Sequence, residues 1–358
     1  MSLIQKSIYN NYTPTSLEDD KVLQELLAKH PHTILVDAFS RQLKELFIIE
    51  NPIYAGEKKE EGFQTEKFKE FCDTHKNNFI YVHYPWNHSV VKTIKRNEYL
   101  KLKTNRNQDL ITAKEQEKLS NCRVGVFGMS VGSNIALVIT QAGISNDIVI
   151  ADFDELDTTN LNRIIAGSHQ IGLNKCVIAA RHIYEDNPFA NVTILEGGVT
   201  QENLKEILEQ KKLDIILEEV DNLEIKIKTR ELAQAYKIPV VMITDNGDGV
   251  MLHVERYDLG YEKIFNKPFE YWKTLFQKKP SMQDIGKVIV GDILGGPQNV
   301  SPRVFASVER IIKHELVSWA QLGSAAILGG VVATIAVKRI VLGEDNSPYI
   351  EKNIQIEF

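Results

Sequence analysis

The sequence is poor in cysteine, and this scarcity excludes two kinds of stabilising site. Its 358 residues include three cysteines, which are Cys72, Cys122 and Cys176. Because they are odd in number and lie far apart, they fit neither a disulfide framework nor the C-x-x-C pairs of a zinc site. We interpret them as thiols in a reducing compartment. The first 20 residues also lack the apolar core of a signal peptide, so we expect a cytoplasmic protein.

Positive charge is not in excess, and long apolar runs are nearly absent. Lysine and arginine number 42 against 48 acidic residues, a net charge of −6, so we expect no nucleic-acid binding. One stretch, 319–337, has no charged side chain and is just long enough to span a bilayer. Its glycines and polar residues weaken its hydropathy. We therefore expect a helix buried in a large core, and no membrane association.

The rest of the composition is that of an ordinary globular protein. Apolar residues make up 43% and charged residues 25%, and the length suits two domains or one large domain with an appendage. From residue 121 onward, short β-branched strands alternate with helical segments. The five expected strands span 122–128, 146–154, 191–197, 213–221 and 239–245. This alternation predicts an α/β fold with a doubly wound, mostly parallel, Rossmann-like sheet.

The segments outside this pattern define the expected domain organisation. We predict an additional N-terminal α/β region over 1–103 and a second domain over 104–358, with an irregular insert at about 259–317. Residues 303–318 and 319–342 are expected to form two late helices. The last six residues, NIQIEF at 353–358, are expected to form an edge strand.

A glycine-rich turn joins the first strand of this sheet to the helix that follows. Gly128 and Gly132 stand where a phosphate-binding turn has glycines, whereas Ser130 replaces the middle one. Glycines let the backbone approach a phosphate, and a helix N-terminus offers free N–H groups. Asp152, 24 residues after Gly128, is placed to bind a ribose hydroxyl. These residues leave open a nicotinamide-dependent oxidoreductase, a nucleotide-using transferase and a turn without a ligand.

The residues after Asp152 favour a triphosphate. Arg163 offers a planar fork for phosphate oxygens and Lys175 a mobile positive charge, neither of which a dehydrogenase needs at this place. Asp221 ends the fourth strand, and the carboxyl end of a parallel strand is where Mg²⁺ or a reacting phosphate is met.

This combination resembles the E1-like adenylating enzymes, the ThiF/MoeB/HesA family. The resemblance rests on the glycine turn, D-F-D-x-L-D-x-x-N-L-N-R at 152–163, G-L-N-K at 172–175 and D-N at 221–222. Residues 104–108 are similar to an R-Y-x-R-Q segment of the family, and 318–343 to its late helix. Residues 219–245 and R-Y-D-L at 256–259 look like bacterial ThiF-type domains that are sometimes fused to a nitroreductase-like domain.

The resemblance implies an ATP-dependent adenylyltransferase that joins a carboxylate to AMP and releases pyrophosphate. The carboxylate would belong to a ubiquitin-like carrier protein or to a small molecule. The resemblance assigns nine site residues: Gly128, Gly132, Asp152 and Asp154 at the nucleotide, Asn160, Arg163 and Lys175 at the phosphates, Asp221 at Mg²⁺, and Arg106 reaching the phosphates across a homodimer. Of these, the catalytic set is Arg163, Lys175, Asp221 and Arg106.

Five of the charged residues also have a structural alternative. Asp152 could cap the following loop, and Asp221 the following helix. Arg163 could pair with Asp154 or Asp157. Lys175 and Arg106 could be solvated surface residues.

Three departures from the family pattern bear on the function. Ser130 replaces a glycine, Lys226 stands where an arginine is common, and no cysteine follows Cys176. Cys176 is at most a weak nucleophile candidate, so we predict chemistry without an enzyme thioester. The alternative function is a catalytically inactive nucleotide-binding scaffold or regulatory module of the same fold.

Overall fold

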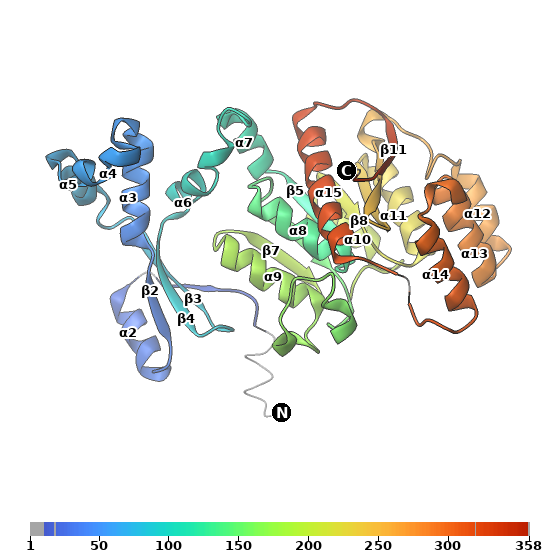
Figure 1. The fold of residues 1–358 in the computed structure, drawn as a ribbon, viewed down its shortest axis with the longest axis horizontal. Coiled ribbons are helices and arrows are strands. Elements are labelled where there is room, and N and C mark those ends of the chain that lie inside the picture. The colour runs from blue at the N-terminus through green and yellow to red at the C-terminus, as the bar shows by residue number, and fades with distance from the viewer. Residues whose placement is uncertain (1–10, 18, 319, 357–358) are drawn as a thin grey trace. The chain divides into compact units, whose positions relative to one another are not determined.

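The computed structural model describes residues 11–17, 19–318 and 320–356 (Figure 1). The contacts within the chain divide it into two compact units. Unit 1 comprises Met1–Lys114 together with Asn187–Phe189, and unit 2 comprises Glu115–Asp186 and Ala190–Phe358.

Unit 1 is a small α/β unit built on a four-stranded sheet. The strand order is β1-β3-β4-β2, with β2 parallel to β4 and the other neighbours antiparallel. Phe47, which is fully buried, packs against several aromatic rings in the helical part. The strands are β1 (Thr15–Leu17), β2 (Ile34–Asp37), β3 (Phe79–Tyr84) and β4 (Ser89–Ile94). The helices are α2 (Asp20–Lys29), α3 (Phe39–Glu50), α4 (Lys59–Phe63), α5 (Glu66–His75) and α6 (Arg96–Lys103).

Unit 2 is built on a seven-stranded sheet in the order β11-β10-β9-β8-β5-β6-β7. The five strands from β7 to β9 are parallel, and β10 and β11 extend the sheet with antiparallel pairing. The strands are β5 (Arg123–Phe127), β6 (Asp147–Ala151), β7 (Asn191–Leu195), β8 (Ile215–Glu218), β9 (Val240–Asn246), β10 (Gly249–Glu255) and β11 (Tyr349–Ile354). The predicted α/β fold with a doubly wound, mostly parallel sheet is confirmed.

Helices cover both faces of this sheet because its strands are apolar on both sides. Val126 faces α8, whereas its neighbour Phe127 lies in a core cluster with residues of α10 and α11. The helices of the unit are α8 (Val131–Gln141), α9 (Lys175–Asp186), α10 (Leu204–Lys211), α11 (Leu223–Tyr236), α12 (Phe269–Gln277), α13 (Met282–Val288), α14 (Pro302–Ile312) and α15 (Gly323–Leu342). Helix α7 (Ala113–Ser120) lies at the division between the units.

The structure corrects three local predictions. The insert at 259–317 is not irregular before its predicted helix at 303–318, because it contains α12 and α13; α14 falls on that predicted helix. Strand β10, which follows β9 after a tight turn, was not predicted. The last strand is Tyr349–Ile354 and therefore begins four residues before the predicted segment, whose final two residues lie outside the described part of the chain.

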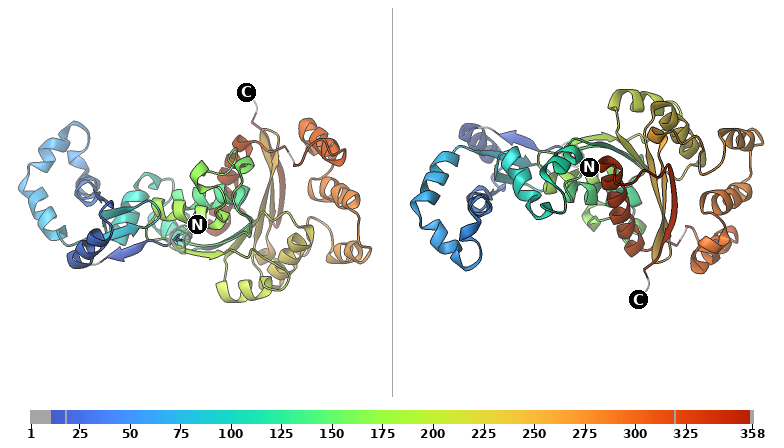
Figure 2. Two further views of the ribbon diagram at one scale, coloured as in Figure 1. Left: turned by 90° about the horizontal axis from the view of Figure 1, so that it is seen from below. Right: turned by 90° about the horizontal axis from the view of Figure 1, so that it is seen from above.

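The charge-free stretch forms α15, which packs along the sheet opposite α12 to α14 (Figure 2). Among the described residues it is the helix that is long and apolar enough to cross a membrane by length and composition. Its glycines permit close packing: a Cβ on Gly329 would lie 2.9 Å from Ile243 Cγ2, and one on Gly330 would lie 3.0 Å from the backbone of Asn134. This contact explains why small residues interrupt the apolar sequence.

A buried cluster of charges ties β8, α11 and β10 together. Arg230 donates to Glu218 through Nη1 at 2.6 Å and to Glu255 through Nε at 2.5 Å, and its guanidinium lies 3.9 Å from the ring centre of Phe265. Lys226 adds a second cation, 3.1 Å from Glu218. Lys226, at the position where the sequence resemblance leads us to expect an arginine, thus pairs within the core.

Candidate functional site

The glycine turn brings the carboxyl ends of three parallel strands together. Gly128 has φ +91°, and a Cβ there would lie 2.5 Å from the carbonyl oxygen of Glu219 after β8. The Gly128 N–H donates to Ala151 at the end of β6, at 2.8 Å, and the Glu219 N–H donates to Phe127 at the end of β5, at 2.7 Å. A Cβ on Gly132 would meet Val126 at 2.9 Å, so this glycine lets α8 approach β5. The free N–H groups of α8 therefore lie at the common edge of β5, β6 and β8.

Asp152 holds the backbone of this edge. One carboxylate oxygen accepts from the Met129 N–H at 2.6 Å and the other from the Asp154 N–H at 2.8 Å. Burial raises the pKa of Asp152, and the two backbone hydrogen bonds oppose this rise. Asp152 therefore does cap the loop that follows it, which is the structural alternative to ribose binding. Each oxygen has a second lone pair, which leaves capacity for a ribose hydroxyl.

Lys175 and Asp154, both assigned to the nucleotide, form an ion pair at 2.7 Å. The Lys175 side chain is only 8% exposed, so the surface alternative for this residue is wrong. Asn174 orients the start of α9 by donating to Asp152 O at 3.0 Å and accepting from the Cys176 N–H at 2.8 Å. The Cys176 thiol is fully buried, and burial raises its pKa well above the usual range, which excludes it as a nucleophile.

Arg163 is anchored to α8 and to its own loop, not to Asp154 or Asp157. Its Nε donates to Ser130 Oγ at 3.1 Å, and its Nη1 donates to Thr159 O at 3.1 Å and to Asn162 Oδ1 at 3.0 Å. In the same loop, the Asn160 side chain is buried and accepts from the Asp157 N–H at 3.0 Å. Asn160 thus shapes the loop that presents Arg163.

Asp221 and Arg106 are both exposed. Asn222, not Asp221, caps α11 by accepting from the Ile225 N–H at 3.1 Å, so the capping alternative for Asp221 is wrong. Within the described part of the chain, the Asp221 carboxylate has no hydrogen-bond or ion-pair partner. Arg106 belongs to unit 1, in a 3₁₀ turn at Asn105–Asn107, whereas the other predicted site residues belong to unit 2.

Sequence reasoning missed two acids at the same sheet edge. Glu219 follows β8 and accepts from the Ile243 N–H at 2.8 Å, and Asp245 lies near the end of β9. Burial raises the pKa of Asp245 to about 6, although Arg163 and a 3.4 Å hydrogen bond from Gln321 oppose the rise. The strand-end argument that selected Asp221 applies equally to Asp245 and could have found it.

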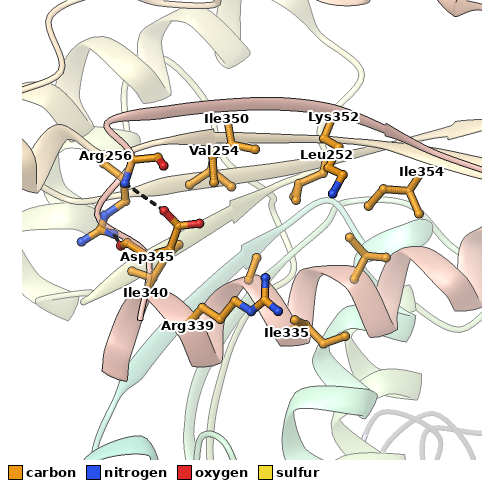
Figure 3. Close-up of a pocket in the computed structure, with 13 residues that line it drawn as sticks. Leu252, Val254, Arg256, Ile335, Arg339, Ile340, Asp345, Ile350, Lys352 and Ile354 are labelled. Atoms are coloured by element: carbon orange, nitrogen blue, oxygen red, sulfur yellow. Dashed lines mark hydrogen bonds between the residues drawn. The ribbon is translucent and has the colours of Figure 1, made fainter. Parts of the chain in front are cut away.

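A cavity of about 280 Å³ lies elsewhere, between α15 and the strands β10 and β11 (Figure 3). Its walls are mainly aliphatic, with Val254 and Ile350 facing Ile335 and Ile340. Because β10 runs antiparallel to β9, its Arg256 end lies toward the amino edge of the parallel strands. None of the residues that line it belongs to the glycine turn or to the predicted site residues, so the cavity is separate from them.

Replacing Gly128 should destabilise unit 2 more than replacing another left-handed glycine. Gly128→Ala places a methyl group against Glu219 O at a left-handed φ, whereas Gly260 has φ +81° but nothing within 4 Å of its Cβ position. We expect Gly260→Ala to cost about 1 kcal/mol and Gly128→Ala at least about 2 kcal/mol more. Urea unfolding of both variants measures the difference, and equal costs would contradict the close approach.

Asp245→Asn should stabilise the protein at neutral pH. The folded pKa of Asp245 is about 6, above its ordinary value of 3.8, so the wild type loses stability as pH rises from about 4 to about 6. The amide variant lacks this loss, and we expect it to gain roughly 1–3 kcal/mol at pH 8 but nearly nothing at pH 4. Urea unfolding at both pH values tests this; a gain independent of pH would contradict it.

Several curated proteins are similar to this chain in sequence. Mycobacterium tuberculosis MT1398, an uncharacterized protein, is 34% identical over 273 residues, 74% of this chain and 36% of that protein. The Escherichia coli sulfur carrier protein ThiS adenylyltransferase is 27% identical over 148 residues, 41% of this chain and 58% of that protein. The Escherichia coli tRNA threonylcarbamoyladenosine dehydratase is 31% identical over 129 residues, 36% of this chain and 46% of that protein. The chain thus spans 36% to 58% of the length of these curated relatives.

A solved structure shares the fold. The crystal structure of Escherichia coli tRNA N6-threonylcarbamoyladenosine dehydratase with AMP matches with a TM-score of 0.52 at 18% identity, covering 70% of this chain and 98% of that one. The sequence model of the ThiF family matches residues 102–357. Because this match includes well over half of the chain and every residue of the glycine turn and its surroundings, the protein belongs to the ThiF family.

Proposed function

We propose that the protein is an ATP-dependent adenylyltransferase that activates a carboxylate as an acyl-adenylate and releases pyrophosphate. One observation carries the proposal: Asp152, the Lys175–Asp154 pair and Arg163 surround the glycine turn at one sheet edge. The family supports it, because a relative of this chain is named a ThiS adenylyltransferase and solved structures of another hold AMP and ATP.

The proposed reaction needs positioning and charge neutralisation more than covalent chemistry by the enzyme. A carboxylate oxygen attacks the α-phosphorus, an O–P bond forms, and the bond to the bridging oxygen breaks as its electron pair leaves with pyrophosphate. Asp152 orients the ribose, and the backbone at Gly128 and Gly132 lies close to the nucleotide. Lys175 and Arg163 offset the charge that develops on the phosphates. Asn160 shapes the loop through its side-chain oxygen and, in this proposal, also contacts the phosphates.

The donors at this edge fit a magnesium ion shared with the phosphates. The described residues contain no cluster of three or more metal-ligating side chains, but Mg²⁺ in phosphate sites takes only one or two carboxylates. Asp221, exposed and without a partner among the described residues, is a suitable ligand. A bound Mg²⁺ would neutralise charge on the departing pyrophosphate.

The carboxylate and the assembly are also part of the proposal. We propose a ubiquitin-like carrier protein or a small-molecule carboxylate as the substrate, with Arg106 completing the site across a homodimer. Two of the three free cysteines, Cys122 and Cys176, are buried, which supports chemistry without an enzyme thioester and a reducing, cytoplasmic location. The sequence division at residues 103 and 104 remains our proposal for the domain boundary.

A nucleotide-binding module without catalysis is the second candidate. The observation that favours it is that Asp152 and Asn160 are already engaged in backbone hydrogen bonds. Such a module would bind ATP in calorimetry without exchanging pyrophosphate with any carboxylate.

The two candidates are separated by ATP–pyrophosphate exchange with a panel of carboxylates and carrier-protein C-termini. We expect Lys175→Ala and Asp221→Ala each to lower exchange by about 10²-fold, because each removes a preorganised charge at the phosphates. Asp73→Ala, which removes an exposed acid of α5, is the matched control and should keep full activity. Full activity in both site variants would contradict the assignment.

A further inference from the structure

The hydroxyl of Ser130 does not cap the helix that it precedes. Ser130 is the N-cap of α8, a position where a serine side chain commonly accepts from the second or third N–H of the helix. No such bond is formed here. Its Oγ instead accepts from Arg163 Nε at 3.1 Å, and Ser133 Oγ donates to the Ser130 carbonyl at 2.9 Å. The side chain is directed at the arginine, not at its own helix.

Arg163 is consequently held at two edges of its guanidinium. Ser130 engages Nε, and the loop oxygens of Thr159 and Asn162 engage Nη1. The Arg163 carbonyl accepts from Asn134 Nδ2 at 2.8 Å, so α8 fixes both the backbone and the side chain. Among the described residues, Nη2 has no hydrogen-bond partner. A planar guanidinium held in this way presents its remaining donors in one direction.

The backbone at position 130 does not require glycine. Its φ is −78°, on the side of the Ramachandran map that L-residues adopt, whereas the left-handed conformation of this turn lies at Gly128. A glycine at 130 would satisfy the turn but could not accept from Arg163. The departure from the family pattern therefore adds a contact and leaves the turn intact.

We propose that Ser130 is a positioning residue that fixes Arg163 for the phosphates of ATP. The proposal rests on the proposed function for the role of Arg163, but the contact itself is a property of the ligand-free protein. An arginine already fixed loses less side-chain freedom when the nucleotide binds. The serine thus acts through the arginine and does not touch the nucleotide itself.

The first test is calorimetry with ATP on the full chain. We expect Ser130→Ala to weaken ATP binding about tenfold, because an Arg163 side chain that is no longer held must lose its rotamer freedom when the nucleotide binds. Ser130→Thr keeps the hydroxyl and should restore most of the affinity. Ser133→Ala, which removes a neighbouring hydroxyl that does not contact Arg163, is the matched control. The decisive variant is Ser130→Ala combined with Arg163→Ala, which should bind no more weakly than Arg163→Ala alone.

The second test needs no nucleotide. In NMR spectra of the ligand-free protein, the Arg163 Nε–Hε resonance should shift toward that of a solvated arginine in Ser130→Ala but not in Ser133→Ala. Normal ATP affinity in Ser130→Ala, or additive losses in the double variant, would overturn the positioning role while the proposed function stands. Absence of ATP binding by the wild type would overturn both, and the resonance would still report whether the contact exists.

Discussion

The approach of Gly128 to the backbone of Glu219 is the constraint on which the site depends. Only a residue without a Cβ can lie there, because that atom would be 2.5 Å from a carbonyl oxygen. The approach lets the ends of β5, β6 and β8 exchange hydrogen bonds, which puts Asp152, the start of α8 and Asp221 on one edge. A doubly wound sheet offers binding sites at such an edge because its loops separate where the strand order reverses. Here β5 is that point, with β6 on one side and β8 on the other.

Rigidity behind this edge comes from the buried charges of Glu218, Arg230 and Glu255. Breaking such a cluster is costly because it leaves a desolvated charge without a partner, so the relative placement of β8, α11 and β10 is tightly specified. Lys226 belongs to the same cluster, since it lies 3.1 Å from Glu218. Lys226 is therefore held in the core behind the site, where it shares the Glu218 carboxylate with Arg230.

The sequence predicted the fold best where a run of residues of one kind suits a single type of secondary structure. β-Branched runs between helical segments predicted the five parallel strands, since such runs fit strands buried on both faces. Strand β10 was not predicted, because the tight turn before it, around Gly247, is also typical of the end of a secondary-structure element. The motif predicted which residues lie near Gly128 but not their contacts. Two examples are the ion pair of the buried Lys175 with Asp154 and the hydrogen bond of Arg163 to Ser130. Both depend on how α9 and the 158–163 loop pack, which a local sequence pattern does not determine.

The two acids missed by the sequence bear on how this edge could accept a polyanion. Glu219 and Asp245 would repel phosphates if both were fully charged. Burial raises the pKa of Glu219 well above its usual range, which favours its neutral form, and Lys226 opposes this only in part because it is paired with Glu218. Burial also raises the pKa of Asp245, and the positive charge of Arg163 opposes this rise and offsets the negative charge of the carboxylate. Arg163 therefore offsets the charge of Asp245, and among the described residues its Nη2 has no hydrogen-bond partner and stays available to the phosphates. Both roles need a fixed side chain, which the hydrogen bonds to Ser130 and Asn162 provide.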